Sequence, residues 1–263
     1  MPLTIAHPAA VLPLRRLGLP LTALIAGSMS PDLEHFFYFS PQSYVSHSLP
    51  GLFLFCLPAG ALLLWVFQRL WLPAAALLIP LPAHLAEPER GSVARVGLGL
   101  LLGAVTHIAW DAFTHEYGFA VINLPILRST LMDGTWHSMV VYKILQHGSS
   151  LLGLGILGLA ALHHRREWPV IRPRLLVILS LALGAAALTA VASVMLQYGI
   201  PPALRGITRY IGIVIVRFAC ISLAALTAVS IFSQILEERH RRLFGQGKMK
   251  DGSAGSDSGR INP

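Results

Sequence analysis

Residues 175–204 read LLVILSLALGAAALTAVASVMLQYGIPPAL, the longest uncharged run in the chain. A helix needs about 20 consecutive apolar residues to cross the hydrocarbon core of a bilayer. This run has no polar face along which a helix of a soluble protein could meet water. The segment therefore predicts a membrane-spanning helix, and the chain is expected to be an integral membrane protein.

Four further segments are apolar enough to be spans, and they lie at residues 52–68, 96–110, 144–164 and 210–236. The last of them contains one charge, Arg217. Residues 17–29 are apolar but short, so they could cross, re-enter or lie buried in the bundle. Residues 72–85 contain three prolines, which are unfavourable inside a helix, and an irregular connection is expected there. The sequence predicts an all-α, polytopic bundle of about five to seven membrane helices.

Composition agrees with this class. Charged residues make up 12% of the chain, against roughly 25% in soluble domains. The net charge of +8 comes from short basic clusters between apolar blocks, which is typical of juxtamembrane topology signals and excludes a nucleic-acid-binding surface. Both cysteines, Cys56 and Cys220, lie inside apolar blocks and predict no disulfide. Residues 1–244 are expected to form the membrane domain, and residues 245–263 a disordered polar tail.

Basic residues also predict an orientation. The cluster that begins at His163 lies between two spans, and positive loops usually face the cytoplasm. Counting spans from this loop puts the C-terminus in the cytoplasm and residues 106–115 on the opposite side. His47 and His147 fall on that opposite side too. Histidines and aspartates from distant parts of the sequence are therefore expected to meet at one membrane face.

The segment THIAWDAFTH, residues 106–115, carries the most specific polar pattern. His107, Asp111 and His115 are spaced four residues apart, which places them on one face of a helix. Imidazole and carboxylate together suit Zn²⁺ and related transition metals. Ionisable groups at membrane depth are costly and usually functional, so a metal site is predicted here.

A second polar segment, SPDLEH at residues 30–35, contains Asp32 and Glu34. In an extended backbone these two side chains would point the same way. A carboxylate in this position could bridge two metal ions or act as a general base. Asp32 and Glu34 are therefore the candidate catalytic residues, and Asp32 is also a candidate ligand.

Three isolated histidines complete the candidate metal ligands: His7, His47 and His147. Ser46 and Ser48 flank His47 and could orient its ring through hydrogen bonds. Lys143 precedes His147 and could hold a phosphate or carboxylate group of a substrate.

Taken in order, these motifs resemble the YdjM-type inner-membrane metal-dependent hydrolases. They resemble more closely a related bacterial family of unknown function, whose members share AHPAA, GSMSPD, SHSLPG, THxxWDxFTH and YKxxQH, here at residues 6–10, 27–32, 46–51, 106–115 and 142–147. The resemblance covers roughly residues 1–240. One departure is Glu34, because the YdjM-like pattern has aspartate at this position.

The same ligand order is distantly similar to that of zinc-dependent phospholipase C and P1-type nucleases. That similarity implies a zinc cluster in which Asp111 or Asp32 bridges, with the ligands His7, Asp32, His47, His107, Asp111 and His115. Together with the predicted topology, we expect one or two Zn²⁺ ions near the outer face of a bacterial inner membrane.

The leading hypothesis is a membrane-bound metal-dependent hydrolase that acts on a lipid or a lipid-linked ester or phosphoester. Membrane lipids and a small or lipid substrate are the expected partners, and no nucleic acid is expected. A metal-stabilised structural subunit, a transporter and an inactive descendant of an enzyme remain open as alternatives. The sequence leaves the oligomeric state undetermined.

Overall fold

The fold is described from a computed structural model, in which the structure describes residues 3–41, 45–79, 81, 87, 89, 91–132, 139–164, 173–199 and 204–251. Helices account for nearly all of the described elements. The two described strands, β1 (Thr130–Met132) and β2 (Met139–Val140), form one short antiparallel pair.

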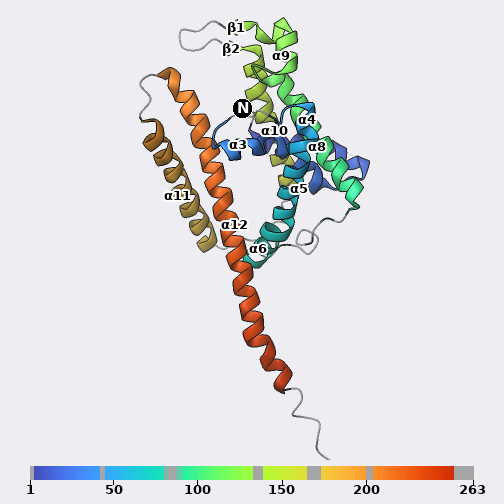
Figure 1. Cartoon of the computed structure of the whole chain (residues 1–263), viewed down its shortest axis with the longest axis vertical. Coiled ribbons are helices and arrows are strands. Elements are labelled where there is room, and N and C mark those ends of the chain that lie inside the picture. Colours follow the sequence, from blue (N-terminus) through green and yellow to red (C-terminus); the bar gives the residue numbers. More distant parts are fainter. Residues whose placement is uncertain are drawn as a thin grey trace, which may run out of the picture.

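Five helices in the described part of the chain are long and apolar enough to cross a membrane: Leu49–Leu77, Val93–Asn123, Val141–His163, Pro173–Tyr198 and Tyr210–His240. They match the five segments predicted from the sequence, and the all-α membrane fold class is confirmed. The second span contains α8 (Val93–Thr114) and α9 (Phe119–Asn123). The third, fourth and fifth spans correspond to α10 (Val141–His163), α11 (Pro173–Tyr198) and α12 (Leu204–Asp251). Figure 1 shows α11 and α12 lying side by side.

The first span is continuous although it contains prolines. It consists of α4 (Leu49–Gly51), the π-helical turns η4 (Leu52–Cys56) and η5 (Phe67–Trp71), and the helices α5 (Leu57–Val66) and α6 (Leu72–Leu78). Pro58 and Pro73 each lie in the first turn that follows a π-helical turn. The wider turn accommodates a ring that lacks a backbone donor. Residues 72–78 are therefore helical, and the irregular connection expected there is wrong for that part.

The N-terminal segment is made of short helices that do not cross. They are η1 (Thr4–Ala6), α1 (Pro8–Val11), η2 (Leu12–Leu17), α2 (Leu21–Met29), η3 (Ser30–Leu33) and α3 (Glu34–Tyr38). Helix α2 has 9 residues, a length of about 14 Å, against the roughly 30 Å of a hydrocarbon core. This length excludes a full crossing, and Ala23, Leu24, Ala26, Gly27 and Ser28 of α2 are buried against the bundle.

Helix α2 is held against α8 by an unusually close backbone contact. A Cβ atom at Gly27 would lie 2.2 Å from Leu100 O, and one at Gly103 would lie 2.2 Å from Leu24 O. Only glycine allows two helix backbones to approach this far, as at close helix crossings in membranes. Buried Ala23, Ala26, Leu64 and Leu100 pack around the same crossing.

At one end of the bundle, α9 and η6 (Pro125–Arg128) cover the beginning of α10. Ala120, Val121, Leu127 and Tyr142 form a small apolar core there. This core joins the end of α8 to the start of α10, at the end of the molecule that also carries β1 and β2 (Figure 1).

Helices α11 and α12 form an antiparallel pair, and Arg217 makes a partly exposed polar contact between them. Its guanidinium donates to Ser193 Oγ at 3.0 Å and to Gln197 Oε1, and it lies over the Tyr198 ring. The charge predicted within this span is thus held by neutral oxygens of α11. Helix α12 continues to Asp251, within the tail 245–263 that the sequence predicts to be disordered, and residues 252–263 lie outside the described residues.

Candidate metal centre

Helix α8 carries two candidate ligands on one buried face. His107 and Asp111 are one helical turn apart, and both are buried. Their Nε2 and Oδ2 atoms lie 3.3 Å apart. The helical spacing recognised in the sequence therefore brings an imidazole and a carboxylate to one point.

The close crossing with α2 sets the orientation of the His107 ring. Because Gly27 lets α2 approach, the Ser28 carbonyl oxygen lies 2.7 Å from His107 Nδ1. A carbonyl oxygen can only accept, so Nδ1 donates and carries a proton. Nε2 then faces the site, which is the arrangement typical of a metal-ligating histidine whose other ring nitrogen is held by a backbone carbonyl.

Asp32 reaches the same point from η3, directly after α2. Its Oδ1 lies 3.5 Å from His107 Nε2 and 3.2 Å from His35 Nε2, and its Oδ2 accepts a hydrogen bond from Thr4 Oγ1 at 2.5 Å. Burial disfavours the charged carboxylate, but interactions with His107 and His35 outweigh it and hold the pKa of Asp32 well below its usual value. Asp32 is therefore an anion in the site.

His47 comes from the loop that precedes α4. Its Nδ1 is hydrogen-bonded to Ser46 Oγ at 2.9 Å, and its Nε2 lies 3.2 Å from Asp111 Oδ2. Glu34 fixes this loop, because its carboxylate accepts hydrogen bonds from the backbone N–H groups of Val45 and Ser46. The loop is thereby held with the His47 ring directed at Asp111.

Ser46 and Ser48 have different roles, although both were expected to orient the His47 ring. Ser46 contacts the His47 ring, whereas the Ser48 hydroxyl accepts from Gly51 N and caps α4.

His7 enters from the N-terminal segment. Its ring stacks on that of His107, with centroids 3.8 Å apart, and its Nε2 lies 3.7 Å from Asp111 Oδ1. Burial, and secondarily the neighbouring His107, lower the pKa of His7 to about 4. The imidazole is then neutral near pH 7 and keeps a lone pair for a metal ion. The preceding backbone is anchored to α10, since Leu3 N donates to Ser150 Oγ.

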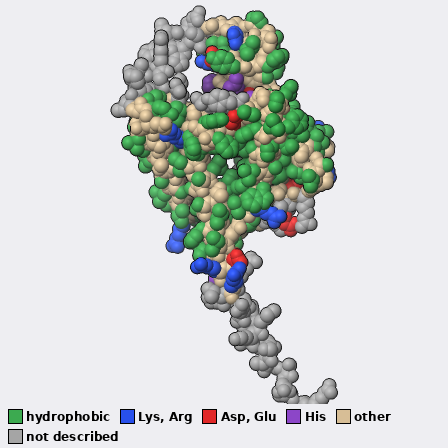
Figure 2. Space-filling view, viewed as in Figure 1, with side chains coloured by type: hydrophobic (Ala, Val, Ile, Leu, Met, Phe, Trp, Pro, Cys, Tyr) green, Lys and Arg blue, Asp and Glu red, His purple; other side chains and the backbone are tan. Residues whose placement is uncertain are grey.

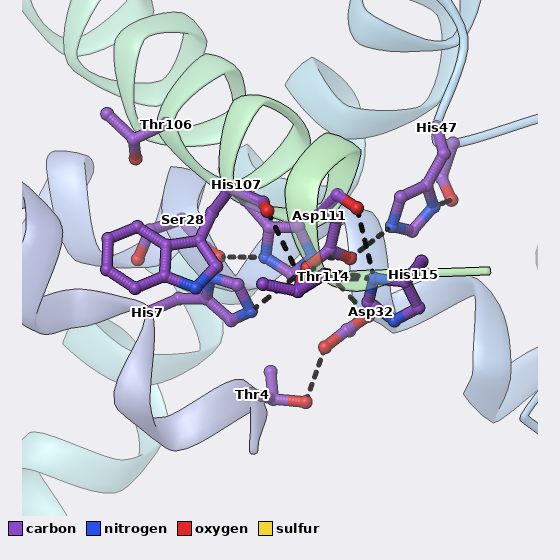
Figure 3. Close-up of polar contacts among 12 residues, drawn as sticks. Thr4, His7, Ser28, Asp32, His47, Thr106, His107, Asp111, Thr114 and His115 are labelled. Carbon is purple, nitrogen blue, oxygen red and sulfur yellow. Dashed lines mark hydrogen bonds and ion pairs between the residues drawn. The ribbon is translucent and has the colours of Figure 1, made fainter. Parts of the chain in front are cut away.

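The ligand atoms of Asp32, His47, His107 and Asp111 all lie within 4.8 Å of one another, and this group could hold a metal ion. Figure 3 shows these side chains converging, with His7 and His115 beside them. Within the described residues, the buried atoms His7 Nε2, His107 Nε2 and Asp111 Oδ1 lack a hydrogen-bond partner. Such atoms cost about 1–3 kcal/mol each when left unpaired, and a cation at this point would satisfy all three.

Asp111 stands at the middle of the cluster and presents its two oxygens to different partners. Oδ1 lies 3.7 Å from His7 Nε2 and 3.4 Å from His115 Nδ1. Oδ2 faces His47 and His107 instead. This geometry suits a carboxylate that bridges two cations, as in two-metal sites.

The cluster is closed on one side and open on the other. The His107 side chain is 0% exposed, whereas the side chains of His47 and His115 are 26% and 32% exposed. Figure 2 shows histidine side chains reaching the surface at the end of the molecule that carries β1 and β2. Structural zinc sites are usually closed by protein ligands, and an open side is typical of sites that admit water or substrate.

Five predicted residues are not in the group of four. His7 and His115 lie beside it, near Asp111 Oδ1. His147 and Lys143 are exposed on α10, and their roles stay predictions. Glu34 is buried, and its contacts with the backbone of Val45 and Ser46 favour a positioning role over that of a base.

Three residues that contact the site, His35, Thr4 and Ser28, are not among those predicted from the sequence. His35 follows Asp32 by three residues, and this spacing on a helical turn was a usable signal. Thr4 and Ser28 carried no such signal, because their contacts depend on how the N-terminal segment folds against α8.

A family model described as a domain of unknown function, DUF4184, matches residues 1–231. The chain belongs to this family. The matched residues include all four members of the cluster, Asp32, His47, His107 and Asp111. It agrees with the resemblance to an uncharacterised family, and it carries no statement about YdjM-type or phospholipase-type relatives. No curated protein and no solved structure matches the chain significantly.

Proposed function

We propose that the protein is a membrane-bound, metal-dependent hydrolase of a lipid or lipid-linked ester or phosphoester. The observation that carries this proposal is the cluster of Asp32, His47, His107 and Asp111, which is buried on one side and partly open on the other. Its position at the end of membrane helices favours a substrate that lies in the bilayer. Zn²⁺ is the proposed metal, because imidazole nitrogens and carboxylates make up the ligand set.

Zn²⁺ in such a site polarises the bond to be cut and lowers the pKa of a water molecule. The residues of the chain then have separate tasks. Asp111 is central and would bind the metal through both oxygens. The Nδ1 atoms of His107 and His47 are hydrogen-bonded to the Ser28 carbonyl and the Ser46 hydroxyl, which orients the two rings. Asp32 would join the metal ligands as an anion, and its contact with His35 at 3.2 Å helps to hold it in that state.

The two oxygens of Asp111 face two different pairs of histidines, and these residues would hold two zinc ions. The wild type is expected to hold about two zinc ions per chain, counted by mass spectrometry on detergent-purified protein. A His7→Ala/His115→Ala variant should keep about one, and a His107→Ala/Asp111→Ala variant should keep none. Equal zinc content in all three folded proteins would contradict the assignment.

Activity is tested with the zinc-loaded protein in phospholipid nanodiscs, by following release of fatty acid and of phosphorylated headgroup. Turnover that a chelator abolishes and zinc restores is expected, and the His107→Ala/Asp111→Ala variant should be inactive. Bound zinc without turnover on esters or phosphoesters would favour the metal-stabilised structural subunit. Transport is disfavoured because the described ligands gather at one end of the bundle rather than along a pathway.

We further propose a place in the bacterial inner membrane with the C-terminus in the cytoplasm. The supporting observation is an excess of exposed arginines at the helix ends away from the cluster, at Arg69, Arg95, Arg174, Arg239 and Arg242. Positive charge of this kind marks the cytoplasmic side.

A further inference from the structure

An apolar groove opens along the membrane span Leu49–Leu77. It has a volume of about 490 Å³, and its walls come from α3, from η4 and α5, and from α12. Volumes of roughly 300–1,000 Å³ are typical of sites that hold a small molecule. Leu33 and Phe36 line one end of it, directly after Asp32 of the metal centre.

The groove lies inside the membrane-crossing part of the chain. Leu54, Ala59 and Leu63 on one wall belong to the span Leu49–Leu77, and Leu223 and Thr227 on the opposite wall belong to the span Tyr210–His240. Hydrophobic side chains cover most of the middle zone of the face seen in Figure 2. The medium around the groove is therefore the lipid of the bilayer.

The lining offers nothing to a polar ligand. Its polar side-chain groups are paired with each other, since Trp71 Nε1 donates to Thr227 Oγ1 at 3.1 Å and the Thr227 hydroxyl donates to Leu223 O. An occupant without hydrogen-bonding groups is therefore favoured. This excludes a headgroup and leaves a hydrocarbon chain.

The length of the groove also fits one chain. Leu54 and Val66 both line it, and at about 1.5 Å per residue they are separated by roughly 18 Å along the helix. That distance is slightly more than half of the roughly 30 Å hydrocarbon core, which is the reach of one acyl chain from its own headgroup.

We propose that this groove binds one acyl chain of a membrane phospholipid, so that the ester or phosphoester at the head of that chain lies at the metal centre. The proposal rests on the proposed function and names its substrate class. The join between the two sites is the Asp32–Leu33 step, where one residue belongs to the metal cluster and the next to the groove.

The test is lipid retention, measured by native mass spectrometry on the detergent-purified full chain. Ala59→Trp fills the groove from α5 and Leu223→Trp fills it from α12. The matched controls are Ala61→Trp and Leu226→Trp, which change exposed residues of the same helices that do not line the groove. The wild type and both controls are expected to retain one phospholipid, and both groove variants should lose it while keeping the wild-type zinc content.

Loss in neither groove variant, or a retained mass that belongs to a polyprenyl lipid or a second copy of the chain, overturns the proposal. Because this readout needs no turnover, it separates the two hypotheses. If the groove variants alone lose the phospholipid and the wild type shows no turnover, the acyl-chain site is supported and the hydrolase function is rejected. Metal-dependent turnover with unchanged lipid retention would do the reverse.

Discussion

His107 shows how much of a metal site is decided by atoms other than the ligands. Its Nε2 faces the site because Nδ1 donates a hydrogen bond to the Ser28 carbonyl. In the same way, the Ser46 hydroxyl is hydrogen-bonded to Nδ1 of His47 and directs Nε2 of that ring toward the site. Groups that orient ligating rings commonly change metal affinity by 10–100-fold. The serines around His47 make this argument testable.

Ser46→Ala removes the hydroxyl that contacts His47 but keeps the backbone bonds of residue 46 to Glu34 and Cys56. We expect zinc affinity to fall by about 10–100-fold with the fold unchanged, measured by competition with a chelator. Ser48→Ala is the control, because it removes a helix cap and should cost about 1 kcal/mol of stability without changing zinc affinity. Equal zinc affinities in the two variants would reject a role for Ser46 in orienting His47.

Glu34 can be assigned by two substitutions. Glu34→Gln keeps an oxygen acceptor for the backbone of residues 45 and 46, so zinc content and activity are expected to stay within about tenfold of wild type. Glu34→Ala leaves those donors unpaired, at a cost of about 1–3 kcal/mol each, and should weaken zinc binding by releasing the His47 loop. A Glu34→Gln protein with full zinc and no activity would instead identify Glu34 as the general base.

At the scale of elements, the crossing of α2 and α8 is the contact on which the centre depends. Gly27→Ala and Gly103→Ala each place a methyl group against a helix backbone that cannot move aside without separating the helices. We expect each to lower stability by about 1–3 kcal/mol and to lose zinc, because Ser28 and Asp32 move with α2. Thermal unfolding and zinc content check this expectation.

Gly97→Ala is the matched control on α8, because a Cβ atom at Gly97 would meet nothing within 4 Å. It is expected to be neutral or to stabilise the helix by about 0.5–1 kcal/mol. Destabilisation of Gly97→Ala to the same extent as Gly103→Ala would show that the crossing is not special.

The sequence predicted elements best where one physical rule dominates. Long apolar runs located all five spans, and the four-residue spacing located His107 and Asp111 on one face of α8. The prediction failed at residues 72–78, because a π-helical turn directly before them accommodates Pro73 within the helix. The composition of the segment does not indicate such a turn. The sequence also could not place α2, whose position depends on glycine contacts between segments far apart in the chain.

For the whole molecule, the residue types of the candidate centre were predictable from the sequence. The contacts that each side chain makes within the centre were not. The separate tasks of Asp32 and Glu34 illustrate this. They are two residues apart, yet one enters the cluster and the other holds the His47 loop. The chain turns from η3 into α3 between them, so the extended backbone assumed for this segment is replaced by a helical one that directs the two side chains apart.

The orientation across the membrane gives a prediction at the same scale. Tyr117 is 81% exposed beyond the end of α8, on the side of the cluster. Tyr117→Cys is expected to react with a membrane-impermeant maleimide in intact cells, and Arg174→Cys only after permeabilisation, because positive loops face the cytoplasm. The opposite labelling pattern would invert the topology and put the metal centre on the cytoplasmic side.

The N-terminal helices do not cross the membrane, yet they supply His7 and Asp32 to a cluster completed by α8. During synthesis these helices are made before α8, so the group of four is complete only after α8 has been inserted. Uptake of the proposed metal would therefore be a late step of biogenesis, and a bound ion would link Asp32 to His107 and Asp111 of α8. Protease sensitivity of the first 35 residues, with and without chelator, would then report whether a newly made copy has finished folding.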